Sequence, residues 1–168
     1  KPCVPGDVKT ISVNRKCHMK YNPQFIAGLT TEQAVFALCH EILHYMSDHF
    51  GRGEAFAKAR GMETDGKLLH LVNIAGDYWI NATLHSSNIG DMPKGALFRD
   101  RSDADKTFEE LLEELLEQQS SEDGPSGEHD GESGGGTSIG GTGEDLDHSE
   151  QLSDAEKEEV NAQRKLDV

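Results

Sequence analysis

The 168-residue sequence is poor in cysteine, in aromatic residues and in long apolar runs. Its three cysteines, Cys3, Cys17 and Cys39, form no CxxC pair, which excludes a cysteine zinc cluster and a disulfide scaffold. We expect reduced thiols and a cytoplasmic protein. No apolar run approaches the roughly 18 residues of a membrane span, and no charged-then-apolar leader opens the chain. These absences predict no membrane partner.

Positive charge is scarce in the C-terminal part of the chain. Residues 1–99 carry 11 Lys or Arg and 9 Asp or Glu, whereas residues 100–168 carry 5 and 22, which together make the net charge of −15. A protein without a basic face does not hold a phosphate backbone, so we expect no nucleic-acid partner. The acidic residues are most simply a solvated surface, although a lid over a cleft is an alternative.

Composition divides the chain into three parts. Residues 1–119 hold nearly all of the apolar pattern and form the predicted domain. Residues 120–143 contain nine glycines, and Ile139 is their only large aliphatic residue, so we expect a flexible Gly/Ser-rich segment. Residues 144–168 form an acidic C-terminal segment, in which Ser153 begins a short helix.

Local patterns predict a small sheet followed by helices. The alternating segments Val8–Asn14 and Lys16–Tyr21 predict two strands joined by a tight turn near Asn14–Arg15. Thr30 to Gln33 has the spacing of a capping box, which starts a helix that we expect to run to about Phe50 and to stop at Gly51–Gly53.

Two more helices follow in the pattern. Apolar residues recur at helical spacing over Lys67–His85, and residues 90–101 have the composition of a loop. A third helix starts near Asp105 and places Phe108, Leu111, Leu112, Leu115 and Leu116 on one face. The sequence therefore predicts an α+β fold, with a small N-terminal hairpin or sheet packed on two helices and further helices toward the C-terminus.

The most informative motif is His40-Glu41-Ile42-Leu43-His44, an HExxH sequence inside the first long helix. Histidines at i and i+4 lie on one face of a helix, so both imidazoles can bind one metal ion. Zinc suits such a site because it binds imidazole, keeps a position open and lowers the pKa of its water to about 7. Glu41 is then placed as the general base. Two histidines of an ordinary helix are the alternative.

A third ligand is needed, and the first helix does not supply one. On this helix His49 lies about 140° round from His44 and points away, and Asp48 lies about 12 Å along the axis from His40. The extended HExxHxxGxxH pattern also fails, because Ser47 and Phe50 occupy its Gly and third His positions.

The second helix offers a better candidate. Asn73, Asp77 and Asn81 follow one another at i, i+4 and i+8, a polar stripe through an apolar helix. Asp77 is the carboxylate of this stripe, either a third ligand or a group that orients a histidine. Gly76 beside it lacks a Cβ and would allow the two helices to approach closely, at a cost of about 1 kcal/mol in helix propensity.

At this point the sequence resembles a family. Asn22 to Phe25, Leu29 to Gln33, the HEILH motif and the segment NIAGDYWIN are similar to the zincin-type (HExxH) metallopeptidase domain of bacterial and phage proteins, often found ahead of a von Willebrand A-like domain. The resemblance covers roughly residues 8–118. It implies a zincin-like fold, His40, His44 and Asp77 as zinc ligands, and Glu41 as the catalytic base.

These observations predict a zinc metallopeptidase that hydrolyses a peptide or protein substrate, with a fused or associated partner domain as a further partner. One alternative is a non-catalytic, zinc-stabilised binding or assembly module. Another is a peptidase that processes only its own chain or a partner, which the absence of an initial methionine allows. Lys16–Tyr21 is our candidate for the edge strand that pairs with substrate. Tyr78, Tyr45 and His148 are the candidates for stabilising an oxyanion.

Overall fold

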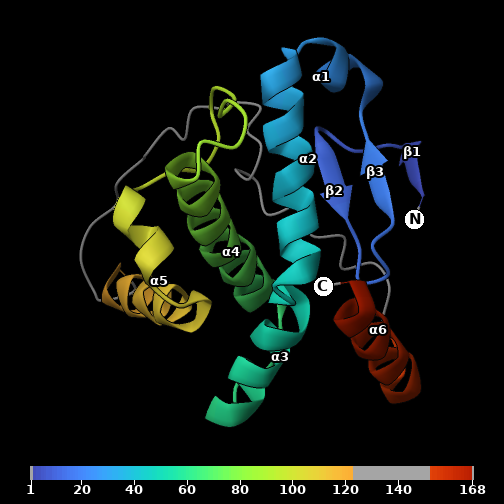
Figure 1. The fold of residues 1–168 in the computed structure, drawn as a ribbon. Coiled ribbons are helices and arrows are strands. Elements are labelled where there is room, and N and C mark those ends of the chain that lie inside the picture. The colour runs from blue at the N-terminus through green and yellow to red at the C-terminus, as the bar shows by residue number, and fades with distance from the viewer. Residues whose placement is uncertain (1, 123–151, 168) are drawn as a thin grey trace.

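The computed structural model describes residues 2–122 and 152–167. In this part of the chain, a three-stranded sheet lies beside α2 (Thr31–Met46), and α2 and α4 (Gly66–Ser86) run side by side through the centre of the molecule (Figure 1). Helices α3 (His49–Arg60) and α5 (Phe108–Glu122) complete the core below and beside α4. The architecture is α+β, as predicted, with six α-helices and one 3-10 turn among the described residues.

The sheet comprises β1 (Cys3–Pro5), β2 (Ile11–Val13) and β3 (Met19–Tyr21), in the order β1-β3-β2. The predicted hairpin is present, because β2 and β3 are antiparallel and Ser12 is opposite Lys20. Its turn is wider than expected: Asn14 accepts hydrogen bonds from the backbone of Lys16 and His18. The prediction that Lys16–Tyr21 is an edge strand is wrong, because β1 pairs with the other side of β3 and places it in the middle.

Helices α1 (Pro23–Ala27) and α2 (Thr31–Met46) begin with side-chain caps. The side chain of Asn22 accepts from the first turn of α1, a short helix that the sequence pattern did not indicate. Thr30 and Gln33 form the predicted capping box of α2, which satisfies two backbone donors that a helix start otherwise leaves open. The start of the HExxH helix is therefore set by local chemistry.

The end of α2 differs from the prediction. The helix stops at Met46, Asp48 adopts a left-handed conformation with φ of 54°, and α3 (His49–Arg60) starts at the next residue. Gly51 and Gly53 lie inside α3 and do not stop a helix. A Cβ on Gly51 would lie 2.6 Å from the capping carboxylate of Asp48, so glycine here makes room for the cap.

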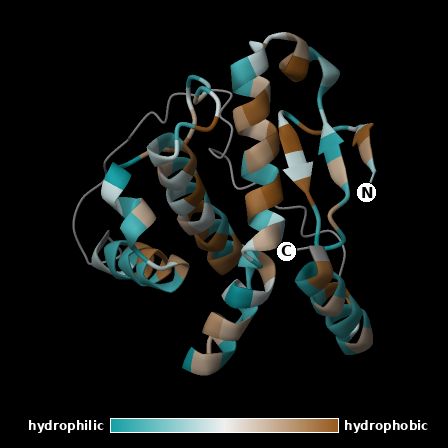
Figure 2. Cartoon of the chain, viewed as in Figure 1, coloured by the Kyte–Doolittle hydropathy of each residue, from teal (hydrophilic) through white to brown (hydrophobic). Residues whose placement is uncertain are grey.

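Helix α4 (Gly66–Ser86) is the central helix of the core. Gly53 of α3 packs against it so closely that a Cβ would lie 2.7 Å from Val72. Figure 2 shows hydrophobic residues recurring along α2 and α4. The main core joins residues of β2, β3, α2, α3, α4 and α5: Val13, Met19, Tyr45, Phe50, Phe56, Ala57, Leu68, Leu71, Val72, Ala75, Phe108, Leu111, Leu112 and Leu115.

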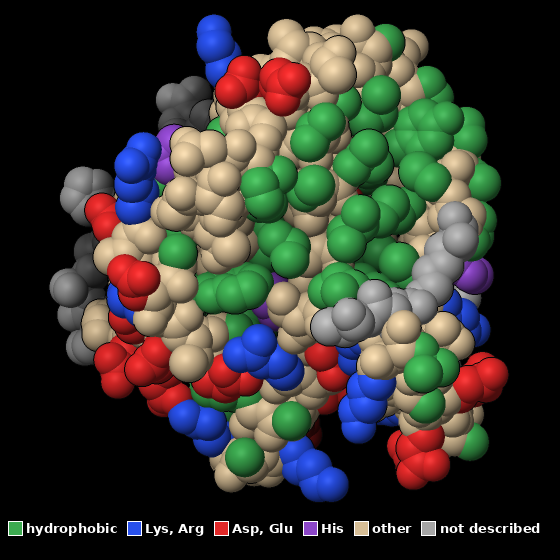
Figure 3. Space-filling model, viewed as in Figure 1, with side chains coloured by type: hydrophobic (Ala, Val, Ile, Leu, Met, Phe, Trp, Pro, Cys, Tyr) green, Lys and Arg blue, Asp and Glu red, His purple; other side chains and the backbone are tan. Residues whose placement is uncertain are grey.

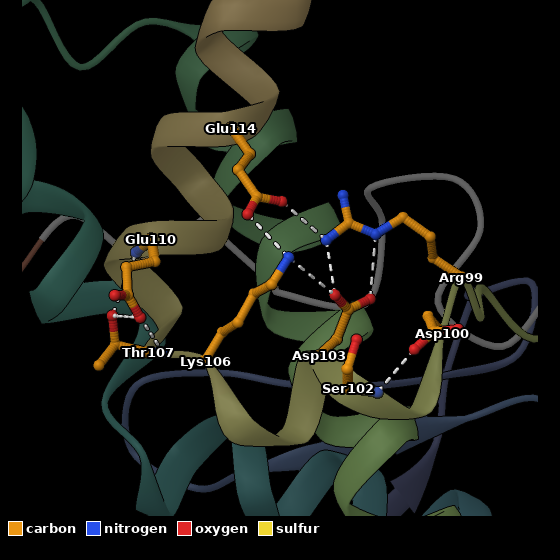
Figure 4. Close-up of polar contacts among 8 residues, drawn as sticks. All are labelled: Arg99, Asp100, Ser102, Asp103, Lys106, Thr107, Glu110 and Glu114. Atoms are coloured by element: carbon orange, nitrogen blue, oxygen red, sulfur yellow. Dashed lines mark hydrogen bonds and ion pairs between the residues drawn. The ribbon is translucent and has the colours of Figure 1, made fainter.

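Helix α5 (Phe108–Glu122) follows the 3-10 turn η1 (Arg101–Asp105) and contributes the predicted leucine face to this core. Arg99, Asp103, Lys106 and Glu114 form an ion-pair cluster between η1 and α5 (Figure 4). Asp103 is buried in this cluster and accepts hydrogen bonds from Nε and Nη2 of Arg99, at 3.0 and 2.6 Å. The cluster holds the loop before η1 against the helical core.

Helix α6 (Asp154–Asp167) docks beside the junction of α2 and α3. Arg164 is buried there, 2.8 Å from Asp48, and its guanidinium lies over the ring of Tyr45. The predicted Gly/Ser-rich segment lies outside the described residues, apart from its first three residues, which continue α5. Within the described ranges, no helix is both long and apolar enough to cross a membrane.

The outer face of α2 carries apolar side chains. Val35, Leu38 and Ile42 are each about two-fifths exposed and follow the i, i+3, i+7 spacing of one helix face. Figure 3 shows hydrophobic side chains gathered on the side of the molecule formed by α2 and the sheet. The same helix thus has one apolar face toward solvent and its histidines toward α4.

Candidate metal centre

Two helices bring three ligand-type side chains together. His40 and His44 lie on α2, and Asp77 lies on α4. The Nε2 atoms of the two histidines are 3.0 Å apart, and Oδ1 of Asp77 lies 3.2 Å from His40 Nε2 and 3.0 Å from His44 Nε2. All three side chains are completely buried. Among the described residues they form the one cluster of three or more His, Cys, Asp or Glu with metal-site geometry.

The close approach of the helices depends on Gly76. A Cβ at this position would lie 2.9 Å from Cε1 of His44 and 2.7 Å from Nδ1 of His49. Real Cβ contacts are essentially never this short. The prediction that Gly76 permits the approach of α4 to the HExxH helix is confirmed. This approach is what allows the short side chain of Asp77 to reach both histidines.

The two asparagines of the predicted stripe contact the cluster from outside. Oδ1 of Asn81 lies 2.8 Å from Nδ1 of His40, and its amide donates to the carbonyl of Leu97. Because that donation fixes the orientation of the amide, the Asn81 oxygen accepts from His40 and leaves His40 Nε2 directed at the cluster. Asn73 donates to Oδ2 of Asp77 at 3.2 Å. Both residues therefore hold the candidate ligands in place.

His49 also joins the cluster, and the expectation that it points away is wrong. Its Nδ1 lies 3.0 Å from Nδ1 of His44, and its ring stacks on Phe108 with centroids 4.7 Å apart. The expectation assumed a continuous helix, whereas the left-handed Asp48 ends α2 and turns the chain back. No signal in the local pattern marks this turn, because aspartate adopts such a conformation only in particular contexts.

Burial and the neighbouring imidazoles set the charge of the cluster. Burial alone would raise the pKa of Asp77, but hydrogen bonds and charge from His40 and His44 outweigh it and hold the pKa below the usual value. Burial, with smaller contributions from His44, Arg52 and His40, places the pKa of His49 well below the usual value. An anionic carboxylate and two imidazole nitrogens are a donor set that binds a divalent metal ion once the imidazole hydrogens on those nitrogens have left.

Glu41 follows His40 on α2 and is also completely buried. Of the three candidates for oxyanion stabilisation, Tyr45 packs in the main core under Arg164, and Tyr78 lies under the guanidinium of Arg99. His148 lies outside the described residues. The structure therefore gives the two tyrosines packing contacts with arginine side chains.

Comparison with known families agrees with this geometry. The family described as "Putative metallopeptidase domain" matches residues 4–166, nearly the whole chain. The chain belongs to this family. The match includes the sheet, the candidate metal centre on α2 and α4, and almost all of α6. No curated protein and no solved structure matches the chain.

The family and the cluster support a metal-dependent peptidase. The α+β fold, with two ligand-type histidines on one helix and an aspartate on the next, is consistent with a zincin-like arrangement. A metallopeptidase family and a buried His-His-Asp set together indicate a metal ion as the cofactor. Because peptidases hydrolyse peptide bonds, membership of this family indicates a hydrolase.

Proposed function

We propose that the protein is a zinc-dependent metallopeptidase that hydrolyses peptide bonds in a peptide or protein substrate. The observation that carries the proposal is the convergence of His40, His44 and Asp77 within 3.0–3.2 Å, directly beside Glu41. Two imidazoles and one carboxylate are a ligand set of catalytic zinc, which leaves a position open. A bound zinc ion would supply Lewis-acid chemistry by polarising the carbonyl and lowering the pKa of a water.

The remaining roles in the proposed reaction belong to side chains of the protein. His40, His44 and Asp77 would hold the ion, and Asn81, His49 and Asn73 would keep their ligand atoms oriented. Glu41 is not needed as a ligand. We infer that it accepts the proton of the attacking water and passes it to the leaving amine, with no covalent intermediate.

Replacing Glu41 with glutamine tests this role. The Glu41→Gln protein should retain zinc, since the three candidate ligands stay intact, but lose at least about 100-fold in hydrolysis because an amide cannot accept the proton. Zinc content is measured by elemental analysis and turnover with internally quenched peptides. Glu32→Gln, at an exposed position of the same helix, is the matched control and should behave as the unmodified protein.

Full activity of Glu41→Gln would remove Glu41 from the mechanism. A protein that binds zinc tightly yet cleaves no peptide in the library would favour the alternative of a zinc-stabilised binding module. The exposed Val35, Leu38 and Ile42 face of α2 is the specific observation that favours this second candidate, since apolar surface marks interaction sites. An intact mass spectrum of the protein incubated with zinc, with and without Glu41→Gln, would detect self-processing.

A further inference from the structure

We propose that His49 is a positioning residue of the metal centre: its Nδ1 accepts the Nδ1 hydrogen of His44, so that His44 carries no hydrogen on Nε2, the atom that would bind metal. The proposal rests on the proposed function, because it assigns a role toward the same metal site. It goes beyond the HExxH motif and the polar stripe of α4, since His49 belongs to neither.

The geometry of the two imidazoles carries the inference. Their Nδ1 atoms are 3.0 Å apart in a fully buried site, so one ring donates a hydrogen and the other accepts it. If His44 donates, its Nε2 has a lone pair directed at His40 and Asp77. If His49 donates, the hydrogen of His44 sits on Nε2, 3.0 Å from both of those residues, where the metal would have to lie.

The two histidine ligands are thus supported in different ways. His40 faces the oxygen of Asn81, which accepts but cannot donate, so its tautomer is determined by one hydrogen bond. His44 faces another imidazole, which accepts only while its own hydrogen is on Nε2. His49 therefore matters as an acceptor at one atom, Nδ1, and not simply as an aromatic ring.

Two other helices and the cap of its own helix hold the His49 ring in this position. Phe108 of α5 stacks on it at an interplanar angle of 17°, and Trp79 of α4 meets it edge-on at 87°. Gly76 leaves the space that its Nδ1 occupies. Asp48 caps α3 by accepting from the backbone of Gly51 at 3.1 Å, which sets the start of the helix that carries His49. The ring is fixed before any ligand arrives.

Two amide substitutions at His49 distinguish its role as a hydrogen-bond acceptor from its role in packing. In His49→Asn the side-chain oxygen can occupy the place of Nδ1, whereas in His49→Gln the longer side chain places its amide at the position of Nε2. His49→Phe keeps a ring on Phe108 without an acceptor. His70→Asn, at an exposed position of α4, is the control.

Zinc affinity, measured by competition with a chromophoric chelator, is the first readout. We expect His49→Gln and His49→Phe to bind zinc about 10- to 100-fold more weakly than the unmodified protein. We expect His49→Asn and His70→Asn to stay within about threefold of it. The second readout is nitrogen-15 NMR of the zinc-loaded proteins. A slowly exchanging Nδ1 hydrogen of His44 should be seen in the unmodified protein and in His49→Asn, and should be lost in His49→Gln.

Two results would overturn the inference while leaving the proposed function intact. One is zinc affinity that is unchanged in all three variants. The other is an equal loss in His49→Asn and His49→Gln, which would show that the ring matters only for packing. Failure of the unmodified protein to bind zinc would instead overturn the proposed function together with this inference. If His49→Phe does not fold, the amide pair still decides the question.

Discussion

The candidate metal centre and the ion-pair cluster of Figure 4 are both built around an aspartate, and they differ in what surrounds it. Asp103 of the cluster meets two cations of the chain itself, Arg99 and Lys106, whose side chains are about one-third exposed. Asp77 of the metal centre meets two imidazoles and one amide, all completely buried. The ion-pair cluster is complete by itself, whereas a divalent cation would complete the metal centre.

The difference in burial also determines how strongly each group affects stability and metal affinity. Exposed ion pairs contribute about 0–1 kcal/mol each, because water and salt screen them. A buried polar group whose hydrogen-bond partner is removed stays desolvated, and no hydrogen bond then offsets the free energy of that desolvation. We therefore expect substitutions in the metal centre to have large effects on metal affinity and stability, and substitutions in the exposed part of the ion-pair cluster to have small ones.

The largest effect is expected for Asp77→Ala. Removal of the only carboxylate among the three candidate ligands should lower zinc affinity by more than about 100-fold, beyond the loss typical of an outer hydrogen-bond partner. Chelator competition measures the affinity, and Asp91→Ala, at an exposed loop position, is the control. A loss of only about tenfold would move Asp77 out of the ligand set and make it a group that orients the histidines.

An intermediate effect is expected for Gly76→Ala. The added Cβ would lie 2.7 Å from His49 Nδ1, so the helices must separate or the imidazoles must shift. Although alanine favours a helix by about 1 kcal/mol, we expect a net loss of about 1–3 kcal/mol in the free energy of unfolding. Urea denaturation measures it. Gly66→Ala, at a position of the same helix with nothing within 4 Å, should be neutral or slightly stabilising; equal behaviour of the two variants would contradict the close-approach argument.

The smallest effect is expected for Glu114→Gln in the ion-pair cluster. The hydrogen bond with Lys106, opposed by desolvation and helped by Arg99, lowers the pKa of Glu114 below its ordinary value of 4.5. A carboxylate with a lowered pKa stabilises the fold above its unfolded pKa, and this contribution is lost as the pH falls through the folded pKa. We expect a loss of about 0.5 kcal/mol at neutral pH.

Thermal unfolding as a function of pH measures this contribution. The difference between Glu114→Gln and the unmodified protein should shrink as the pH falls below 4.5, the ordinary pKa. Glu117→Gln, exposed on the same helix, serves as the control. A loss at neutral pH as large as that of Gly76→Ala would contradict the contrast between the two regions.

Much of the site follows from short-range rules that need no tertiary information. Thr30 and Gln33 start α2 because a helix start needs acceptors for its free backbone donors. The i, i+4 spacing then places His40 and His44 on one face, and the same spacing aligns Asn73, Asp77 and Asn81 on α4. These predictions depend only on helix geometry, and the structure has both helices.

Other features were decided by tertiary structure alone. As a glycine, Gly53 favours the end of a helix. In the fold it lies inside α3 and allows this helix to pack closely against Val72. We expected β3 to be an edge strand that pairs with substrate, but β1 pairs with its other side. The position of His49 depends on the left-handed conformation of Asp48, because a change of backbone conformation at a helix end redirects the chain that follows. Spacing along the sequence determines which residues share a helix face, but only packing between helices determines which faces meet.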